Sequence, residues 1–143
     1  HLALEVREAL RVLLVEGEEG ARPIDAETRR LALALAPPGE VQSGVEPVVV
    51  TPDGLRDVDL AAYDSVIACN LEAWPRERVP ELVKWVERGG GLAVFLGDLV
   101  DVAAWERDLA PLLPCRLGER VESPSEDDAP GLVAPLPDHP LAK

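Results

Sequence analysis

The chain has 143 residues, of which 47% are hydrophobic and 29% are charged, and its formal net charge is −13 at pH 7. This size and composition are typical of one folded domain that can bury a core without disulfides or a structural metal. The negative charge argues against a nucleic acid or an anionic membrane as a partner, because phosphate binding needs clustered Lys and Arg. No segment has the ~20 apolar residues that span a bilayer. The absence of Met and the start at His1 indicate a domain of a longer protein.

The first half of the chain predicts a strand, a helix and a second strand. Residues 11–15, Arg-Val-Leu-Leu-Val, are typical of a buried strand and run into a loop that contains Glu16 and Glu18. A helix is expected to begin near Asp25, the predicted N-cap, and to end at the Pro-Pro-Gly sequence that starts at Pro37. The β-branched residues within 47–51 predict the second strand.

The second half repeats this unit twice. Residues 65–70, Ser-Val-Ile-Ala-Cys-Asn, predict a third strand, and the apolar stripe that ends at Val86 predicts a helix. Gly89, the first of three glycines, is the expected residue just beyond the end of that helix. Residues 92–96 are all apolar, which predicts a fourth strand covered on both faces. A last helix is expected over residues 101–113.

The C-terminal part carries weaker signals. Residues 116–122 are consistent with a weak edge strand, and residues 123–130 form an acidic, turn-rich sequence with little to bury. We therefore expect one α/β domain over residues 1–122, with residues 123–143 as a loop or tail that belongs to it or extends it.

Strands and helices in this order predict an α/β fold, a three-layer α/β/α sandwich around a mostly parallel, flavodoxin-like open sheet. Right-handed crossovers give the strand order 2-1-3-4. Ligands of such sheets bind at the carboxyl ends of the strands. The candidate ligand-binding residues at these ends are Glu16, Glu18, Cys69, Asn70, Gly97 and Asp98.

Three segments together resemble the class I glutamine amidotransferase-like superfamily: residues 11–18, 61–70 and 86–98, the last reading Val-Glu-Arg-Gly-Gly-Gly-Leu-Ala-Val-Phe-Leu-Gly-Asp. The chain is most similar to the variant found in bacterial membrane-anchored proteins that also carry a von Willebrand A module. The resemblance covers roughly residues 11–118 and implies a flavodoxin-like fold, protein partners or other domains of the parent chain, and a membrane-associated parent. It gives no localisation for this domain alone.

The catalytic triad that the resemblance implies is incomplete in this sequence. Active amidotransferases place a nucleophilic Cys on the turn after a strand, and the matching turn here, Leu96-Gly97-Asp98, has none. Cys69 lies on the segment that resembles the oxyanion loop, and His139 is the only His inside the chain. We therefore expect a non-catalytic interaction or ligand-sensing domain without a cofactor. A hydrolase or amidotransferase that uses Cys69, with His139 as its base, is the alternative enzyme hypothesis.

Two further hypotheses concern the acidic residues. Receiver domains also have acidic residues after the first strand, but the position of their phosphoacceptor Asp here reads Cys69-Asn70, which argues against phosphotransfer. Carboxylates of Glu18, Asp98 and Asp101 are a candidate set for Mg²⁺ or Ca²⁺. Asp98 and Asp101 equally stand where helix N-caps are needed, so capping is the competing interpretation.

Overall fold

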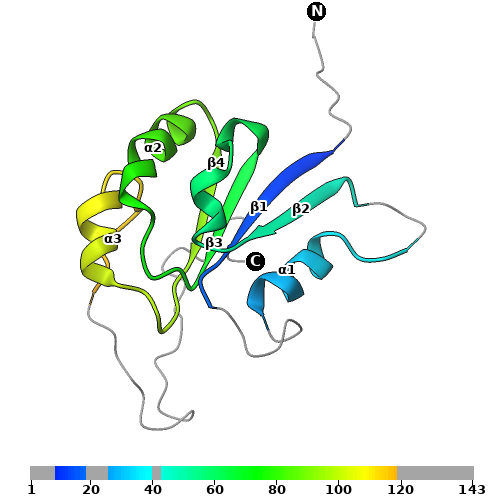
Figure 1. Cartoon of the computed structure of the whole chain (residues 1–143), viewed down its shortest axis with the longest axis horizontal. Helices are drawn as coiled ribbons and strands as arrows, with labels where there is room; N and C mark the ends of the chain where they lie inside the picture. The colour runs from blue at the N-terminus through cyan, green and yellow to red at the C-terminus, as the bar shows by residue number, and fades with distance from the viewer. Residues whose placement is uncertain (1–8, 19–25, 40–42, 119–143) are drawn as a thin grey trace, which may run out of the picture.

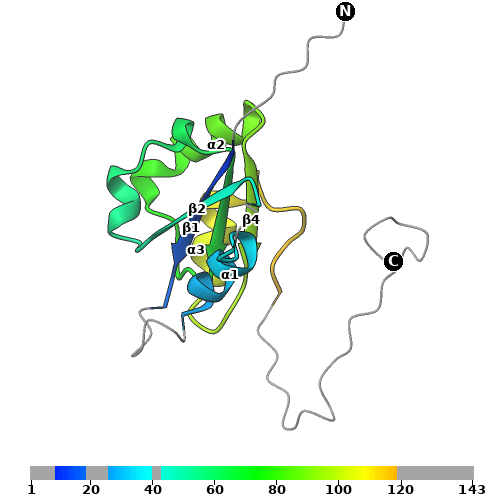
Figure 2. The ribbon, with the colours of Figure 1, turned by 90° about the vertical axis from the view of Figure 1, so that its right-hand side faces the viewer.

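The computed structural model describes residues 9–18, 26–39 and 43–118, and it is built around a four-stranded parallel sheet (Figures 1 and 2). The strand order β2-β1-β3-β4 and the parallel pairing of all neighbours are those predicted from the sequence. The strands are β1 (Leu10–Glu16), β2 (Val45–Val50), β3 (Ser65–Cys69) and β4 (Gly91–Phe95). Within the described part of the chain, β1 and β3 are therefore the inner strands, and β2 and β4 form the two edges.

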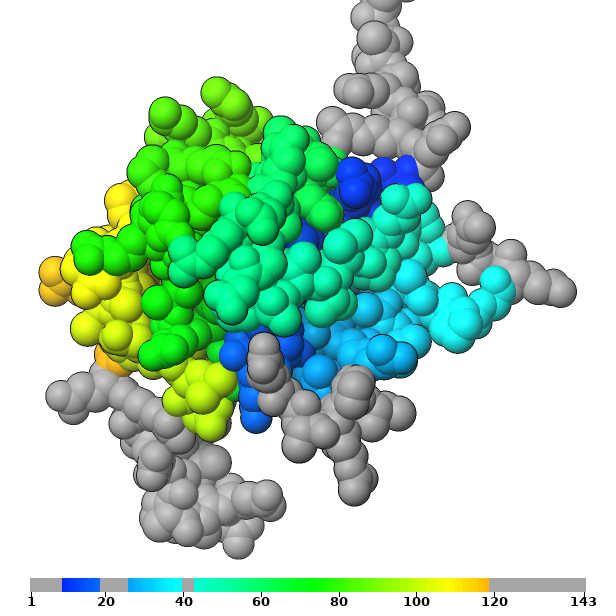
Figure 3. Space-filling model, in the orientation of Figure 1, coloured from blue at the N-terminus to red at the C-terminus, as the bar shows by residue number. Residues whose placement is uncertain are grey.

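One face of the sheet carries the main core. Alternate residues of the inner strands point to it, among them Leu13 of β1 and Val66 of β3, which are partners in the register and fully buried. Two short 3₁₀ segments and two α-helices pack over this face: η1 (Gly54–Asp57), η2 (Leu60–Ala62), α2 (Val79–Glu87) and α3 (Val102–Leu109). A third 3₁₀ segment, η3 (Arg76–Arg78), leads into α2. In the space-filling view β1 shows only near its two ends, because the η1–η2 segment lies over its middle (Figure 3).

The indole of Trp105 links α3 to the chain that follows β3. Its Nε1 donates to the carbonyls of Leu71 and Glu72 at 2.9 and 3.0 Å, and its ring is almost fully buried in the core. A buried indole needs such an acceptor, since an unpaired N–H in the core is costly. These two hydrogen bonds fix α3 against the chain that follows the carboxyl end of β3.

The opposite face of the sheet is covered in part. Helix α1 (Glu27–Leu35) packs on β1 and β2. On β4 the residues of this face, Ala93 and Phe95, are exposed, and Phe95 has 56% of its surface accessible. The prediction that residues 92–96 are covered on both faces is wrong for the described part of the chain. An apolar run shows that a strand can be buried. Whether both of its faces are covered depends on where the helices pack.

The joint between α2 and β4 follows the sequence prediction. Pro80 lies in the first turn of α2, where its missing N–H leaves no bond unmade. Gly89 follows the C-cap residue Arg88 and has a φ of +102°, which L-residues with a Cβ rarely adopt. The Gly89 N–H donates to the carbonyl of Val86 at 2.9 Å. The three glycines therefore end the helix and lead directly into β4.

Several sequence predictions fall partly or wholly on residues outside the described ranges. Residues 116–118, the described start of the predicted weak edge strand, are not in a strand. Residues 119–122, which complete that segment, lie outside the described residues, as do residues 123–143, residues 1–8 and Asp25.

Candidate functional site

The carboxyl ends of the strands lie along one edge of the sheet, as the parallel topology requires. Glu16 is the last residue of β1 and pairs in the register with Cys69, the last residue of β3. Cys69 in turn pairs with Phe95 at the end of β4. Most of the predicted site residues therefore lie near this edge.

The Glu16 side chain acts as a cap for helix α1. It is only 6% exposed, and its Oε2 accepts hydrogen bonds from the Thr28 hydroxyl at 2.5 Å and from the Thr28 N–H at 3.3 Å. Its Oε1 accepts from the Glu18 N–H at 3.2 Å. The N-cap position is Ala26, which has no side-chain cap, so Asp25 is not the N-cap that the sequence predicted. A carboxylate at a helix N-terminus is stabilised by the helix dipole as well as by the donors it receives.

Asn70 joins the ends of β3 and β4. It is buried with a φ of +48°, a left-handed conformation that Asn tolerates better than most residues. Its Nδ2 donates to Asp98 Oδ1 at 2.8 Å, and its Oδ1 accepts from the Leu99 N–H at 2.9 Å. The Asn70 N–H donates to the carbonyl of Phe95 at 2.9 Å. The sequence singled out both Asn70 and Asp98 but gave no sign that they bind each other.

Cys69 does not have the surroundings of a catalytic nucleophile. The residue is 3% exposed, and burial, followed by the negative charges of Glu16 and Glu27, raises the pKa of its thiol to about 11. Activated cysteines have a lowered pKa, since the thiolate is the reactive form. Here the carboxylates disfavour the thiolate. His139, the partner in the alternative enzyme hypothesis, lies outside the described residues.

The three candidate metal ligands are not brought together. Asp101 is the N-cap of α3, and its Oδ1 accepts from the Ala104 N–H at 3.0 Å, which confirms the capping interpretation. Asp98 binds Asn70 rather than capping α3, so the capping interpretation is wrong for this residue. Within residues 9–18, 26–39 and 43–118 there is no group of three or more His, Cys, Asp or Glu side chains that could hold a metal ion.

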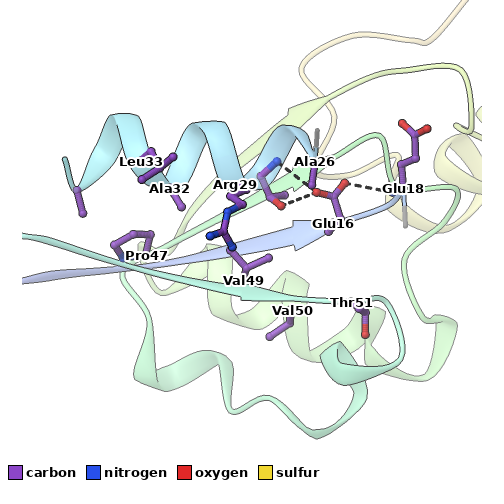
Figure 4. A pocket seen from close by; sticks show the side chains of 12 residues that line it. Glu16, Glu18, Ala26, Arg29, Ala32, Leu33, Pro47, Val49, Val50 and Thr51 are labelled. Carbon is purple, nitrogen blue, oxygen red and sulfur yellow. Dashed lines mark hydrogen bonds between the residues drawn. The ribbon is translucent and has the colours of Figure 1, made fainter. Parts of the chain in front are cut away.

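A groove between α1 and β2 reaches the end of β1 and encloses a cavity of about 500 Å³ (Figure 4). Its floor and walls are mostly apolar and include Leu33 of α1 and Val49 of β2. Glu16 and Glu18 line one end, and the side chain of Arg29 crosses the space between helix and strand. Sequence reasoning missed Arg29 because it considered only strand ends, whereas this groove runs along the side of a helix.

A second uncovered region surrounds β4. Phe95, Leu96 and Leu99 are the large apolar residues exposed here. Next to them, Leu96 and Gly97 share a cavity of about 310 Å³ with Leu117 and Gly118, the last described residues. Sequence reasoning placed the apolar run of β4 in the interior and so did not identify this surface.

Searches for similar proteins identify no family for this chain. Comparisons of the chain with protein-family models, with curated proteins and with solved structures found no significant match in any of the three. Among the described helices, none has the length and apolarity needed to cross a membrane.

Proposed function

We propose that this chain is a non-catalytic interaction domain of a larger, membrane-associated bacterial protein. The proposal includes a three-layer, flavodoxin-like sandwich of the class I glutamine amidotransferase-like kind, with residues 1–122 as the domain and residues 123–143 as its extension. The strand order and the segments that resemble this superfamily support the fold.

The observation that carries the proposal is the contrast between polar side chains that interact within the fold and apolar side chains that are exposed. The polar groups at the strand ends serve the fold: Glu16 caps α1, Asn70 binds Asp98, and Asp101 caps α3. At the same time Phe95 and its apolar neighbours stand exposed on an edge strand. Contiguous exposed apolar patches are typical of surfaces that bind a protein, a membrane or a ligand.

The competing enzyme hypothesis, a hydrolase that uses Cys69, has a direct test. Glutamine hydrolysis by the full-length protein would have to disappear in Cys69→Ser and persist in Cys115→Ser. We expect no hydrolysis above background in either variant or in the unmodified protein, because the buried Cys69 thiol with its raised pKa is a poor nucleophile.

The interaction itself is tested by placing a photoreactive benzoylphenylalanine at position 95 of the full-length protein in its own cells. We expect a discrete protein adduct after irradiation. The matched control is position 49, an exposed apolar position (46%) on the other edge strand, which is expected to give none. No adduct from position 95, or equal adducts from both positions, would overturn the proposal.

A second candidate function is ligand sensing in the groove between α1 and β2, because both charged and apolar side chains line this groove. Arg29 and Glu18 could hold the two charged ends of a zwitterion, while Leu33 and Val49 contact its apolar part. Free leucine and phenylalanine are therefore the probes, and amide chemical-shift changes along α1 and β2 are the measurement. Leu33→Lys is expected to abolish them and Leu10→Lys to leave them, since both residues are half exposed and only Leu33 lines the groove.

A further inference from the structure

We draw no further inference here: the strongest candidate, the exposed apolar surface that Phe95, Leu96 and Leu99 form at the carboxyl end of β4, carries none, because the described residues end at Gly118, next to Leu96 and Gly97, and nothing within them shows what covers this surface.

Discussion

The Cα of Gly97 lies directly against the side-chain amide of Asn70. A Cβ placed on Gly97 would overlap the Asn70 amide atoms, and a Cβ on Gly17 would overlap the Asn70 backbone. Asn70 is therefore held between two glycines, one after β1 and one after β4, and its hydrogen bonds to Asp98 and Leu99 depend on this close approach.

We expect Gly97→Ala to destabilise the fold by about 1 to 3 kcal/mol, the usual range for forcing extra atoms into a packed site. Gly39→Ala is the control, because a Cβ there has no atom within 4 Å, and its effect should stay within about 0.5 kcal/mol. Urea denaturation midpoints of the two variants give the comparison. Equal midpoints would mean that Asn70 moves aside at little cost.

The hydroxyl of Thr28 is expected to stabilise the fold through Glu16. Thr28→Val keeps the shape but removes a donor to a buried carboxylate, so it should cost about 1 to 3 kcal/mol. Thr51→Val removes an exposed hydroxyl that accepts from the Gly54 N–H, and should cost less. If chemical denaturation gave the two variants the same stability, Glu16 would not be an important cap for α1.

The raised pKa of Cys69 predicts a loss of stability at high pH. The folded thiol titrates at about 11 and the unfolded thiol at about 9.0, so the native state binds more protons between these values. The stabilising contribution is complete below pH 9 and disappears as the pH rises to 11, by at most about 2 to 3 kcal/mol.

Cys69→Ala is the control for this pH dependence, since it removes this titration and leaves those of Tyr, Lys and Arg. The unfolding free energy of the unmodified chain should fall more steeply between pH 9 and 11 than that of the variant. Parallel curves would show that the Cys69 thiol titrates at its ordinary pKa in the folded chain.

Substitutions on β4 and α2 separate exposed from buried apolar residues. Phe95 is exposed, so Phe95→Ala should cost less than about 1 kcal/mol. Leu82 is fully buried under the core face, so Leu82→Ala should cost about 2 to 5 kcal/mol. Thermal unfolding at low micromolar concentration measures both, and a large cost for Phe95→Ala would mean that this face is covered after all.

The fold was predictable from the sequence because its signals are local. Apolar runs, the glycines at 89–91 and the short spacing of strands specify four strands, their order and the end of α2. Asp101 was predictable as a cap because an N-cap acts on its own helix. These features need no knowledge of what lies across the fold.

The interactions that the sequence did not reveal join residues far apart in the chain. Glu16 caps a helix that begins eleven residues later, and Asn70 binds Asp98 at a separation of 28 residues. The exposure of Phe95 depends on the position of α1, which covers β1 and β2 but leaves β4 open. Composition and periodicity carry no information about such long-range contacts.

Gly89 provides a test of backbone strain that is free of steric contacts. Its φ is +102°, and a Cβ there would have no atom within 4 Å, so Gly89→Ala changes only the conformational energy of the residue. Alanine at a positive φ costs about 1 to 2 kcal/mol. Lys84→Ala, on the exposed side of the same helix, should change stability by less than about 0.5 kcal/mol. Guanidinium chloride midpoints of the two variants give the comparison. Equal midpoints would mean that residue 89 relaxes to a negative φ and that the helix ends without needing glycine.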